Sequence, residues 1–390
     1  MSAAPARVHN LPAARAQFGD LIGRLLPAFE RADPLGDAAA AWLSTCPEGH
    51  AVFEAALVRP ERAPEPVAAL LESVAGLPEW VEPARLARAS HLFSRAGVVG
   101  GFVLGLRSLV LGYAAPAGNK PLTFSGRLRE AAPRRLAETA RFVTAVCEPG
   151  GLLPGGEGRA IALRVRLMHA QVRRLLLATG RWNHAAWAVP INQHDMLATG
   201  LLFSHIYLDG LRLLGLQVGP DEADDYVHLW RLASWILGVD GDLVPDREPA
   251  ARRLAECIFL TQGPPDADSR ALTAALLQAP LQAARTPGER RLAAARVRLS
   301  GSICRHLIGH GLADALGVPS ERHPFSVSLL ASVFGGLDRL RAALPPIDAS
   351  AVALGRRYWD LVVDVGLNGE RPTYPMPDRL GRRPPPPDSL

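Results

Sequence analysis

Residues 159–179 read RAIALRVRLMHAQVRRLLLAT, and this stretch decides the fold class. Its apolar residues return about once per helical turn, at Leu163, Leu167, Val172 and Leu176, which predicts a long amphipathic helix. The rest of the chain repeats this pattern in blocks that Gly and Pro separate. We find no segment that alternates apolar and polar residues as a strand does. The sequence therefore predicts an all-α protein.

The helical blocks predict a single large helical domain over residues 1–367. Within it, the short helices of residues 1–95 could form a subregion, and residues 368–390 are a Pro-rich C-terminal tail. We expect a loop at 114–125 and Asp37 as the cap of the second helix. The expected helices are 18–31, 38–43, 51–58, 67–74, 96–113, 133–147, 159–179, 192–214, 222–237, 248–261, 269–279, 285–310, 325–342 and 348–365.

The composition excludes several classes of protein. Of the 390 residues, 48% are hydrophobic and 21% are charged, and such a chain is too apolar for intrinsic disorder. The 43 basic and 38 acidic residues leave a net charge of +5, which is too small and too scattered to predict nucleic-acid binding. Cys46, Cys147, Cys257 and Cys304 lie too far apart for a disulfide scaffold or a paired metal site, so we expect buried thiols.

The longest apolar run covers residues 96–113 and contains Arg107 and five glycines. A membrane-spanning helix needs about 20 apolar residues with few charges, so we expect a buried helix and no transmembrane span. Glycines let a flat group or another backbone come close, which favours the wall of a pocket. Residues 1–10 lack the apolar stretch of a secretory signal, so we expect a cytoplasmic protein, with peripheral membrane contact as a further option.

One face of the 159–179 helix carries Arg166, His169 and Arg173, because residues three and four apart are neighbours on a helix. The simpler interpretation is a surface row of arginines beside a packed histidine. The functional interpretation is an imidazole ligand for a haem iron, with both arginines facing the haem carboxylates. Imidazole suits iron, and guanidinium forks match carboxylates. The spacing alone leaves both interpretations open.

A second helix, which begins near Pro133, carries Arg135, Glu138 and Thr139 on one face. By itself this pattern predicts a solvated ion pair, either between Arg135 and Glu138 or between Glu138 and Arg141. Alone, this pattern predicts no function, and it points to one only when it is read together with other segments of the chain.

Two further groups of polar residues have structural explanations. His194 and Asp195 stand near the start of the 192–214 helix, where polar residues commonly cap the backbone. His205 and Asp209 are four residues apart and are expected to form a buried pair on one helix face. Neither group predicts a reaction.

Several common catalytic motifs are missing. His306 and His310 have the spacing of a zinc pair, but Leu307 stands where the catalytic Glu would be, so we expect no metal there. The sequence contains no GxSxG motif, no phosphate-binding loop and no GxGxxG turn after a strand. These absences disfavour hydrolases, NTPases and dinucleotide-dependent enzymes.

Four segments occur in the same order as in a known family. They are PRRLAETARF at 133–142, VRLMHAQVRRLL at 165–176, PINQHDMLATGLLFSHIYLDGLRLLGL at 190–216 and YVHLWRLASWILGV at 226–239. Together they resemble the catalytic domain of the mpaB-type oxygenases and rubber oxygenases (latex-clearing proteins), over residues 18–239 and weakly beyond. The resemblance implies an all-α fold that encloses a b-type haem.

The resemblance also implies roles for individual residues. The RxxHxxxR motif of the family falls on Arg166, His169 and Arg173, with His169 as the proximal ligand of the iron. An Arg and a Thr on the distal helix of the family fall on Arg135 and Thr139.

The chain departs from the rubber oxygenases at two places. Glu138 stands where they carry a distal Lys, and Asn119 and Lys120 stand in the loop where they carry an acidic residue. A carboxylate cannot supply an ammonium group and changes the charge of the pocket. The resemblance therefore implies haem more firmly than it implies rubber as the substrate. Glu138 becomes the candidate base for removing an allylic proton.

The resemblance implies a haem-dependent oxygenase of the dioxygenase type that uses O2 to cleave C=C bonds. Its substrate would be a hydrophobic small molecule or polymer, isoprenoid-like or lipid-like, in an apolar pocket formed by the 96–113 run with Leu201, Leu202 and Phe203. Haem carries the difficult chemistry in such enzymes, which agrees with the missing nucleophile motifs. Two alternatives remain: a non-catalytic haem-binding or lipid-binding helical protein, and a helical protein whose arginines bind an acidic membrane surface.

Overall fold

The computed structural model describes residues 5–124, 132–320 and 324–367, and of residues 132, 133, 135 and 324–326 it describes the backbone alone. Helices make up nearly all the regular structure of these residues, and no strand occurs among them. The predicted all-α fold is confirmed. The predicted tail at 368–390 lies outside the described residues.

The helices follow one another along the chain with short connections. The N-terminal part forms α1 (Leu11–Phe18), α2 (Asp20–Ala28), α3 (Pro34–Leu43), α4 (Gly49–Val58), the 3₁₀ turn η1 (Pro60–Arg62) and α5 (Glu65–Glu72). The next part forms α6 (Pro83–Val103), the π-helical segment η2 (Leu104–Ser108), α7 (Leu109–Ala114) and α8 (Lys120–Phe124). The central part forms α9 (Ala132–Cys147), α10 (Glu157–Ala178), α11 (His184–Trp187), α12 (Gln193–Phe203), α13 (His205–Leu213), α14 (Pro220–Ile236) and α15 (Glu248–Thr261). The C-terminal part forms α16 (Ala267–Ala283), α17 (Pro287–Ile308), α18 (His310–Ala315), α19 (Pro324–Ala343) and α20 (Pro345–Leu367).

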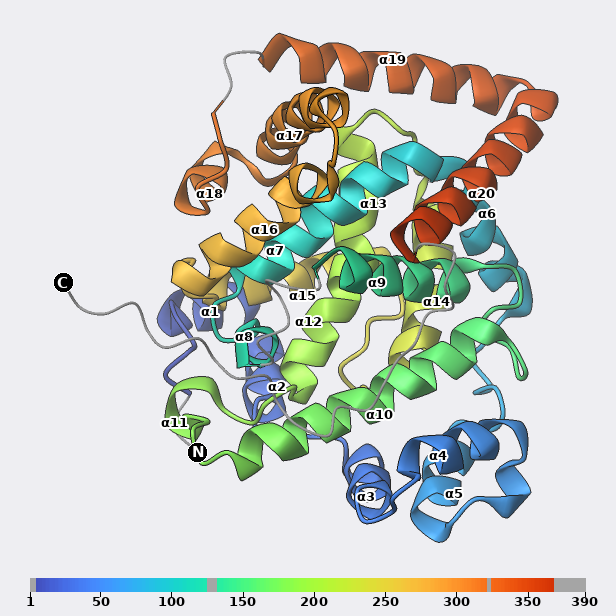
Figure 1. Cartoon of the computed structure of the whole chain (residues 1–390), viewed down its shortest axis with the longest axis vertical. Helices are drawn as coiled ribbons and strands as arrows, with labels where there is room; N and C mark the ends of the chain where they lie inside the picture. Colours follow the sequence, from blue (N-terminus) through green and yellow to red (C-terminus); the bar gives the residue numbers. More distant parts are fainter. Residues whose placement is uncertain (1–4, 125–131, 321–323, 368–390) are drawn as a thin grey trace.

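Helix α10 crosses the lower half of the molecule and joins its parts (Figure 1). Helix α3 packs against α10. Helix α9, which precedes α10 in the chain, also packs alongside it, and the two form a helical hairpin. The small group α3 to α5 lies below α10, whereas α19 lies along the top of the molecule. Helix α20 packs on both α6 and α9, so the C-terminal helix covers the outer side of the hairpin.

The 96–113 run lies in the helical segment Pro83–Ala114, which includes α6, η2 and α7 and is kinked at Gly97, where φ is 40° and ψ is −121°. By length and composition this helix could cross a membrane, with a mean hydropathy of 1.6, and 56% of its most apolar window is buried within the structure. Its glycines admit another backbone, as predicted. A Cβ on Gly97 would lie 3.1 Å from Cα of Gly355, and a Cβ on Gly355 would lie 1.7 Å from the carbonyl oxygen of Ser94.

Three local predictions were wrong. Helix α3 begins one turn earlier than expected, because Asp33 and not Asp37 accepts the capping hydrogen bond, at 3.2 Å. The expected 192–214 helix is broken at Ser204, whose φ of −102° and ψ of −96° lie outside helical values. Helix α8 forms within the expected loop 114–125. Each difference arises from local backbone geometry that apolar periodicity does not encode.

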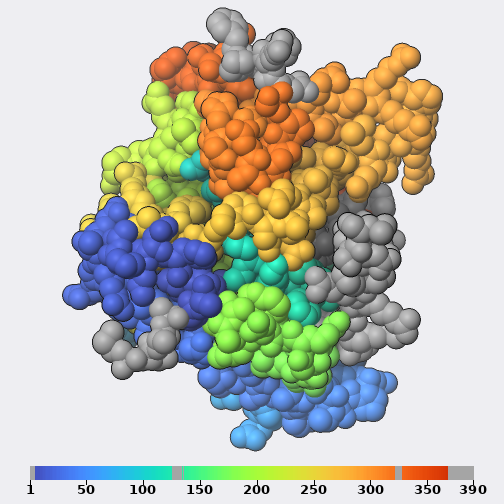
Figure 2. All heavy atoms as spheres, turned by 90° about the vertical axis from the view of Figure 1, so that its left-hand side faces the viewer, coloured from blue at the N-terminus to red at the C-terminus, as the bar shows by residue number. Residues whose placement is uncertain are grey.

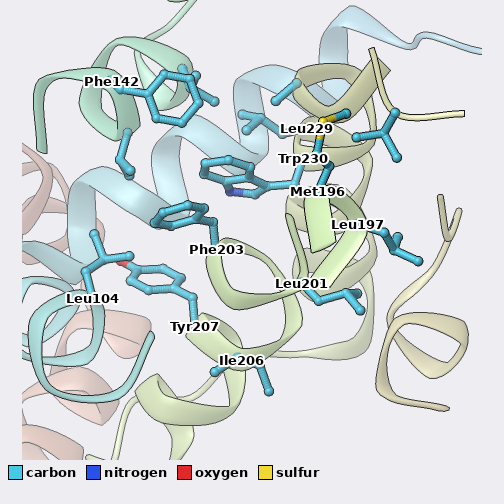
Figure 3. Close-up of a cluster of buried hydrophobic side chains, with 14 of the residues drawn as sticks. Leu104, Phe142, Met196, Leu197, Leu201, Phe203, Ile206, Tyr207, Leu229 and Trp230 are labelled. Atoms are coloured by element: carbon cyan, nitrogen blue, oxygen red, sulfur yellow. The ribbon is translucent and has the colours of Figure 1, made fainter. Parts of the chain in front are cut away.

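An aromatic cluster lies in the core where α9, α12 and α14 meet (Figure 3). The rings of Phe203 and Trp230 stack with centroids 5.0 Å apart, and Phe142 meets Trp230 edge-on at 6.2 Å. Such pairs add directional packing to the burial of apolar area. Three of the four cysteines are free and buried, as predicted, and the fourth is partly buried.

Candidate functional site

Helix α10 presents Arg166, His169 and Arg173 on one face, as predicted. Both arginines are buried and the histidine is partly exposed. A guanidinium keeps its charge throughout the pH range in which proteins fold, so a buried arginine needs anionic or carbonyl partners. Those partners decide what this face of the helix can do.

Arg166 is held by Asp33 in a two-point contact. Its Nε lies 2.7 Å from one carboxylate oxygen and its Nη2 lies 2.8 Å from the other, and both side chains are more than nine-tenths buried. Nη1 donates to the carbonyl oxygen of Ile236 at 3.4 Å. Gly238 closes over the pair, since a Cβ there would lie 2.6 Å from Nε of Arg166. Because Asp33 also caps α3, this contact joins α10, α3 and the end of α14.

Arg173 is held by α3 and by the loop before α12. It forms an ion pair with Asp37 and donates to the carbonyl oxygens of Pro190 at 3.0 Å and Ile191 at 2.8 Å. In this loop Ala188 (φ 60°) and Ile191 (φ 52°) occupy the left-handed region. That region is costly for residues with a Cβ, and most of all for a β-branched residue. Arg173 therefore holds a strained loop against α10.

His169 lies between these two arginines along α10. Its Nδ1 is buried and has no hydrogen-bond partner in the part of the chain that the structure describes. Burial, and then the charge of Arg173, lower the pKa of the imidazole to about 4, against the opposing effect of Asp33. The ring is therefore neutral at pH 7, and neutral imidazole is the form that binds a metal.

Apolar side chains share the face of α10 with His169. Val165 and Val172 lie four residues before and three residues after His169 on the same face, Met168 directly precedes it on the adjoining face, and all three are partly exposed. In α9, which packs against α10, Leu136 is also partly exposed. A neutral imidazole among partly covered apolar side chains suits a flat and largely apolar group.

The arrangement fits a haem better than a bare metal ion. No group of three or more His, Cys, Asp or Glu side chains placed to hold a metal occurs among the described residues. Metals bound only by protein side chains normally have several such ligands. A haem supplies its ring nitrogens and commonly takes one imidazole from the protein. The single unpartnered imidazole of His169 meets that requirement.

A separate apolar cavity of about 490 Å³ lies between α7, α12, α13, α15 and α18, and none of its lining residues comes from α9 or α10. Leu111, Leu201 and Leu202 line it, which confirms part of the predicted pocket wall. Phe203 does not line it and packs in the aromatic cluster with Trp230, so that part of the prediction was wrong (Figure 3). Cavities of this size typically hold small ligands.

Comparison with known proteins places the chain among oxygenases. The family model for the catalytic domain of the ER-bound oxygenase mpaB/B′ and the rubber oxygenase matches residues 96–336, which is more than half of the chain. The chain belongs to this family. A rubber oxygenase from Streptomyces sp. (strain K30) is 25% identical over 291 residues, which cover 73% of this chain and 68% of that protein. The solved structure of a latex clearing protein in the closed state has a similar fold, with a TM-score of 0.66 and 22% identity, covering 85% of this chain and 91% of that chain.

Membership in the mpaB/rubber oxygenase family confirms the resemblance that the four sequence segments indicated. All four segments lie within the matched residues 96–336. The family, together with the absence of strands among the described residues, confirms the predicted class of fold and supports an oxygenase. The roles of individual residues in this family member stay predictions.

The predicted distal residues belong to α9. Glu138 and Thr139 are partly exposed, and Glu138 accepts a hydrogen bond from Nε of Arg134 at 3.3 Å. Arg141 pairs with two other carboxylates and not with Glu138, so that predicted ion pair was wrong. The side chain of Arg135 lies outside the described residues. The catalytic roles of Arg135, Glu138 and Thr139 stay predictions.

One polar pair that the sequence predicted is replaced by two contacts between distant segments. Nδ1 of His205 lies 3.2 Å from Glu248, and Asp209 pairs with Arg107, so the expected pair of His205 with Asp209 was wrong. Helix geometry places His205 and Asp209 on one face, because they are four residues apart. Each of them nevertheless binds a side chain of another element.

The start of α12 also differs from the prediction. Asn192 is the cap of this helix, and Asp195 instead accepts a two-point contact from Arg7, at 2.6 and 2.8 Å. Although burial would raise it, the charges of Arg7 and His194 hold the pKa of Asp195 well below its usual range. Sequence reasoning missed Arg7 because 188 residues separate it from Asp195 and no local pattern marks it.

Asp33 and Asp37, the partners of the two arginines, were also missed as site residues. A signal for Asp33 was available, because an Asp that precedes a Pro at the start of an apolar block is typical of a helix cap. Its second role, as the partner of a buried guanidinium 133 residues away, has no local signal.

The Asp33→Asn variant keeps a side chain that can cap α3 but leaves the charge of Arg166 buried without a counter-ion. We expect a loss of about 3 kcal/mol in the free energy of unfolding, since removing one member of a buried pair costs about 3–5 kcal/mol. Urea unfolding at pH 7 measures this loss.

The matched control is Glu54→Gln, which removes the partner of Arg164 on the same helix, where both side chains are partly exposed. It should cost less than about 1 kcal/mol. Equal losses for the two variants would contradict the assignment of Asp33 as the structural partner of α10.

Proposed function

We propose that this chain is a haem-dependent oxygenase of the dioxygenase type, which holds haem b and uses O2 to cleave C=C bonds in a hydrophobic, isoprenoid-like or lipid-like substrate. Membership in the mpaB/rubber oxygenase family supports the oxygenase activity. The observation that carries the haem is the imidazole of His169, which is neutral at pH 7, partly exposed and has a buried nitrogen without a partner among the described residues.

His169 would hold the haem iron from α10. When bound, the haem would supply the O2 chemistry that amino-acid side chains lack. A protonated imidazole has no electron pair to give to a metal, so the pKa of about 4 keeps His169 available over the whole physiological pH range. Val165, Met168 and Val172 would offer apolar contact to the ring system.

Arg166 and Arg173 would act mainly by holding α10 in place. Their guanidiniums are already paired with Asp33 and Asp37, and both also donate to backbone carbonyls. A haem carboxylate could bind either arginine only by displacing one of these partners. We therefore assign the two arginines to positioning His169, with contact to the haem carboxylates as a secondary role.

The apolar cavity would hold the part of a long substrate that extends away from His169 and Glu138, since none of its lining residues comes from α9 or α10. Insertion of both atoms of O2 across one C=C bond gives two carbonyl groups, so the substrate needs an apolar and water-poor site and no protein nucleophile. Leu111, Leu201, Leu202 and Ile258 provide such a lining. A volume of about 490 Å³ suits a short chain, and a polymer would extend beyond it.

Glu138 would act as the base that removes an allylic proton, and Arg135 and Thr139 would complete the distal side. A carboxylate oxygen can accept a proton, and the Glu138 carboxylate forms a partly exposed ion pair with Arg134 at 3.3 Å. This differs from the distal Lys of the rubber oxygenases and is the feature in which the chain would depart most from them.

A second candidate is a non-catalytic haem-binding or lipid-binding protein. The apolar cavity favours it, because such a cavity binds an apolar chain whether or not the chain is then oxidised. Either form of this candidate would share the cavity with the oxygenase but would consume no O2. Oxygen consumption in the presence of an unsaturated substrate separates them.

The absorption spectrum of the purified protein tests the haem assignment. After expression with ample haem, we expect a Soret band that shifts on reduction, and we expect the His169→Ala variant to lose the band because the iron loses its protein ligand. His184→Ala is the matched control, since His184 is exposed on α11 and pairs with Glu30. A variant without His169 that retained full haem would overturn the assignment.

Filling the cavity tests its role as the substrate site. A Cβ on Gly112 would lie 3.0 Å from Cδ1 of Leu202, so Gly112→Leu should occupy the cavity and reduce O2 consumption with squalene by roughly tenfold or more, with the Soret band unchanged. Gly105→Leu lies on the same long helix, faces open space and should leave the rate unaltered. Equal rates in the two variants would place the substrate elsewhere.

A further inference from the structure

The end of α16 and the first part of α17, residues 281–299, form an arm that projects from the body of the protein. It appears in Figure 2 as the orange projection at the upper right. Nearly every residue of 281–299 is exposed or partly exposed, and Ala293 alone is buried. The second part of α17 packs on the body through Ile303, Cys304 and Leu307, whereas the arm presents most of its surface to solvent or to a partner.

The arm carries most of the net charge of the protein. Residues 281–299 contain five arginines and one glutamate, which gives +4, whereas the whole chain has a net charge of +5. The single acid, Glu289, is engaged in the cap of α17, where it accepts hydrogen bonds from the backbone amides of Arg285 and Thr286. The charge that looked scattered along the sequence is thus concentrated on one projecting element.

The guanidiniums of the arm are available to a partner. The five arginines are all exposed, and none of their guanidiniums forms an ion pair or a hydrogen bond within the described residues; they are Arg285, Arg290, Arg291, Arg296 and Arg298. By contrast, many arginines of the body, such as Arg95, Arg166 and Arg212, are paired with carboxylates. An unpaired row of guanidiniums favours an anionic partner.

Exposed leucines run between the arginines of α17. Leu292 is 57% exposed and Leu299 is 43% exposed, and they lie seven residues apart on the same side of the helix. With 3.6 residues per turn, Arg296 flanks this stripe on one side, and Arg291 and Arg298 flank it on the other. The stripe lies about 100° around the helix from the buried Ala293, and both of its leucines are exposed.

We propose that the arm docks on an anionic phospholipid membrane. A helix that lies in a membrane interface buries an apolar stripe at the level of the acyl chains and extends flanking arginines to the lipid phosphates. The α17 pattern provides both parts, with a local charge of +4 for attraction to acidic headgroups. A nucleic acid would engage the arginines but would leave the leucine stripe exposed to water. This proposal is independent of the proposed oxygenase activity.

Vesicle flotation of the full-length protein tests the proposal. The protein should float with phosphatidylcholine vesicles that contain about 30% phosphatidylserine, should bind pure phosphatidylcholine vesicles at least tenfold more weakly, and should be released as salt is raised. The Arg296→Gln/Arg298→Gln variant should lower the partition coefficient roughly 30-fold, and Leu292→Ser/Leu299→Ser should lower it by at least tenfold.

Helix α20 offers matched controls. Leu354 and Leu361 are also seven residues apart and are 66% and 61% exposed, and Arg356 and Arg357 are exposed beside them. Helix α20 also carries Asp348, Asp360 and Asp364 and so lacks the net positive charge of the arm. Leu354→Ser/Leu361→Ser and Arg356→Gln/Arg357→Gln should therefore leave vesicle binding unchanged. All the substituted side chains are exposed, so each variant should keep the circular dichroism spectrum and the unfolding temperature of the parent.

Three outcomes would overturn the proposal. The first is an absence of binding to phosphatidylserine vesicles at low salt. The second is equal loss of binding in the α17 and α20 variants, which would indicate a surface elsewhere. The third is binding to single-stranded RNA that exceeds vesicle binding and depends on the arginines but not on Leu292 and Leu299, which would assign the arm to nucleic acid.

Discussion

A buried ion pair between Arg166 and Asp33 fixes the geometry on which the candidate site depends. Taking two charges out of water costs several kcal/mol per ion, and the cost is offset only when the hydrogen-bonding groups are also satisfied. Here Nε, Nη1 and Nη2 of Arg166 all have partners, and the Asp33 carboxylate also caps α3. The absence of a side chain at Gly238 leaves room for the pair. One contact thus sets the position of α10 against its neighbours.

The same network determines the chemistry that is open to His169. The imidazole lies one turn from Arg166 and one turn from Arg173, and burial together with the charge of Arg173 keeps its pKa near 4. A histidine in a row of arginines is therefore neutral, and its buried Nδ1 has no partner within the described residues. The face of α10 with two arginines thus presents one uncharged imidazole that can bind a metal. Membership in an oxygenase family is consistent with such a role.

Much of the fold could be predicted from the sequence because apolar periodicity encodes helices directly. The 159–179 helix and the 248–261 helix were predicted to within two residues. The break at Ser204 and the early start of α3 were missed, since both depend on backbone geometry at single residues. The order of four sequence segments sufficed for the family, which the match over residues 96–336 confirms.

The partners of the site could not be predicted, because the sequence gives no distance between residues far apart in the chain. The row of Arg166, His169 and Arg173 was predicted, but Asp33 and Asp37 precede their arginines by 133 and 136 residues. Without them, both arginines appeared free for an anionic ligand. The net charge of +5 was misleading for the same kind of reason, since only the structure shows that the charge of residues 281–299 projects from the body on unpaired side chains.

The most direct test of the central claim is the haem affinity of the Asp33→Asn/Arg166→Met double variant. It removes both buried charges and keeps a capping side chain on α3, so the fold should persist. The account predicts that the variant binds haem at least tenfold more weakly than the parent, because α10 no longer holds His169 in one orientation. The control variant Glu54→Gln/Arg164→Met, on the exposed side of α10, should bind haem as the parent does. Unchanged haem affinity in the Asp33/Arg166 variant would contradict the claim that this ion pair positions the ligand.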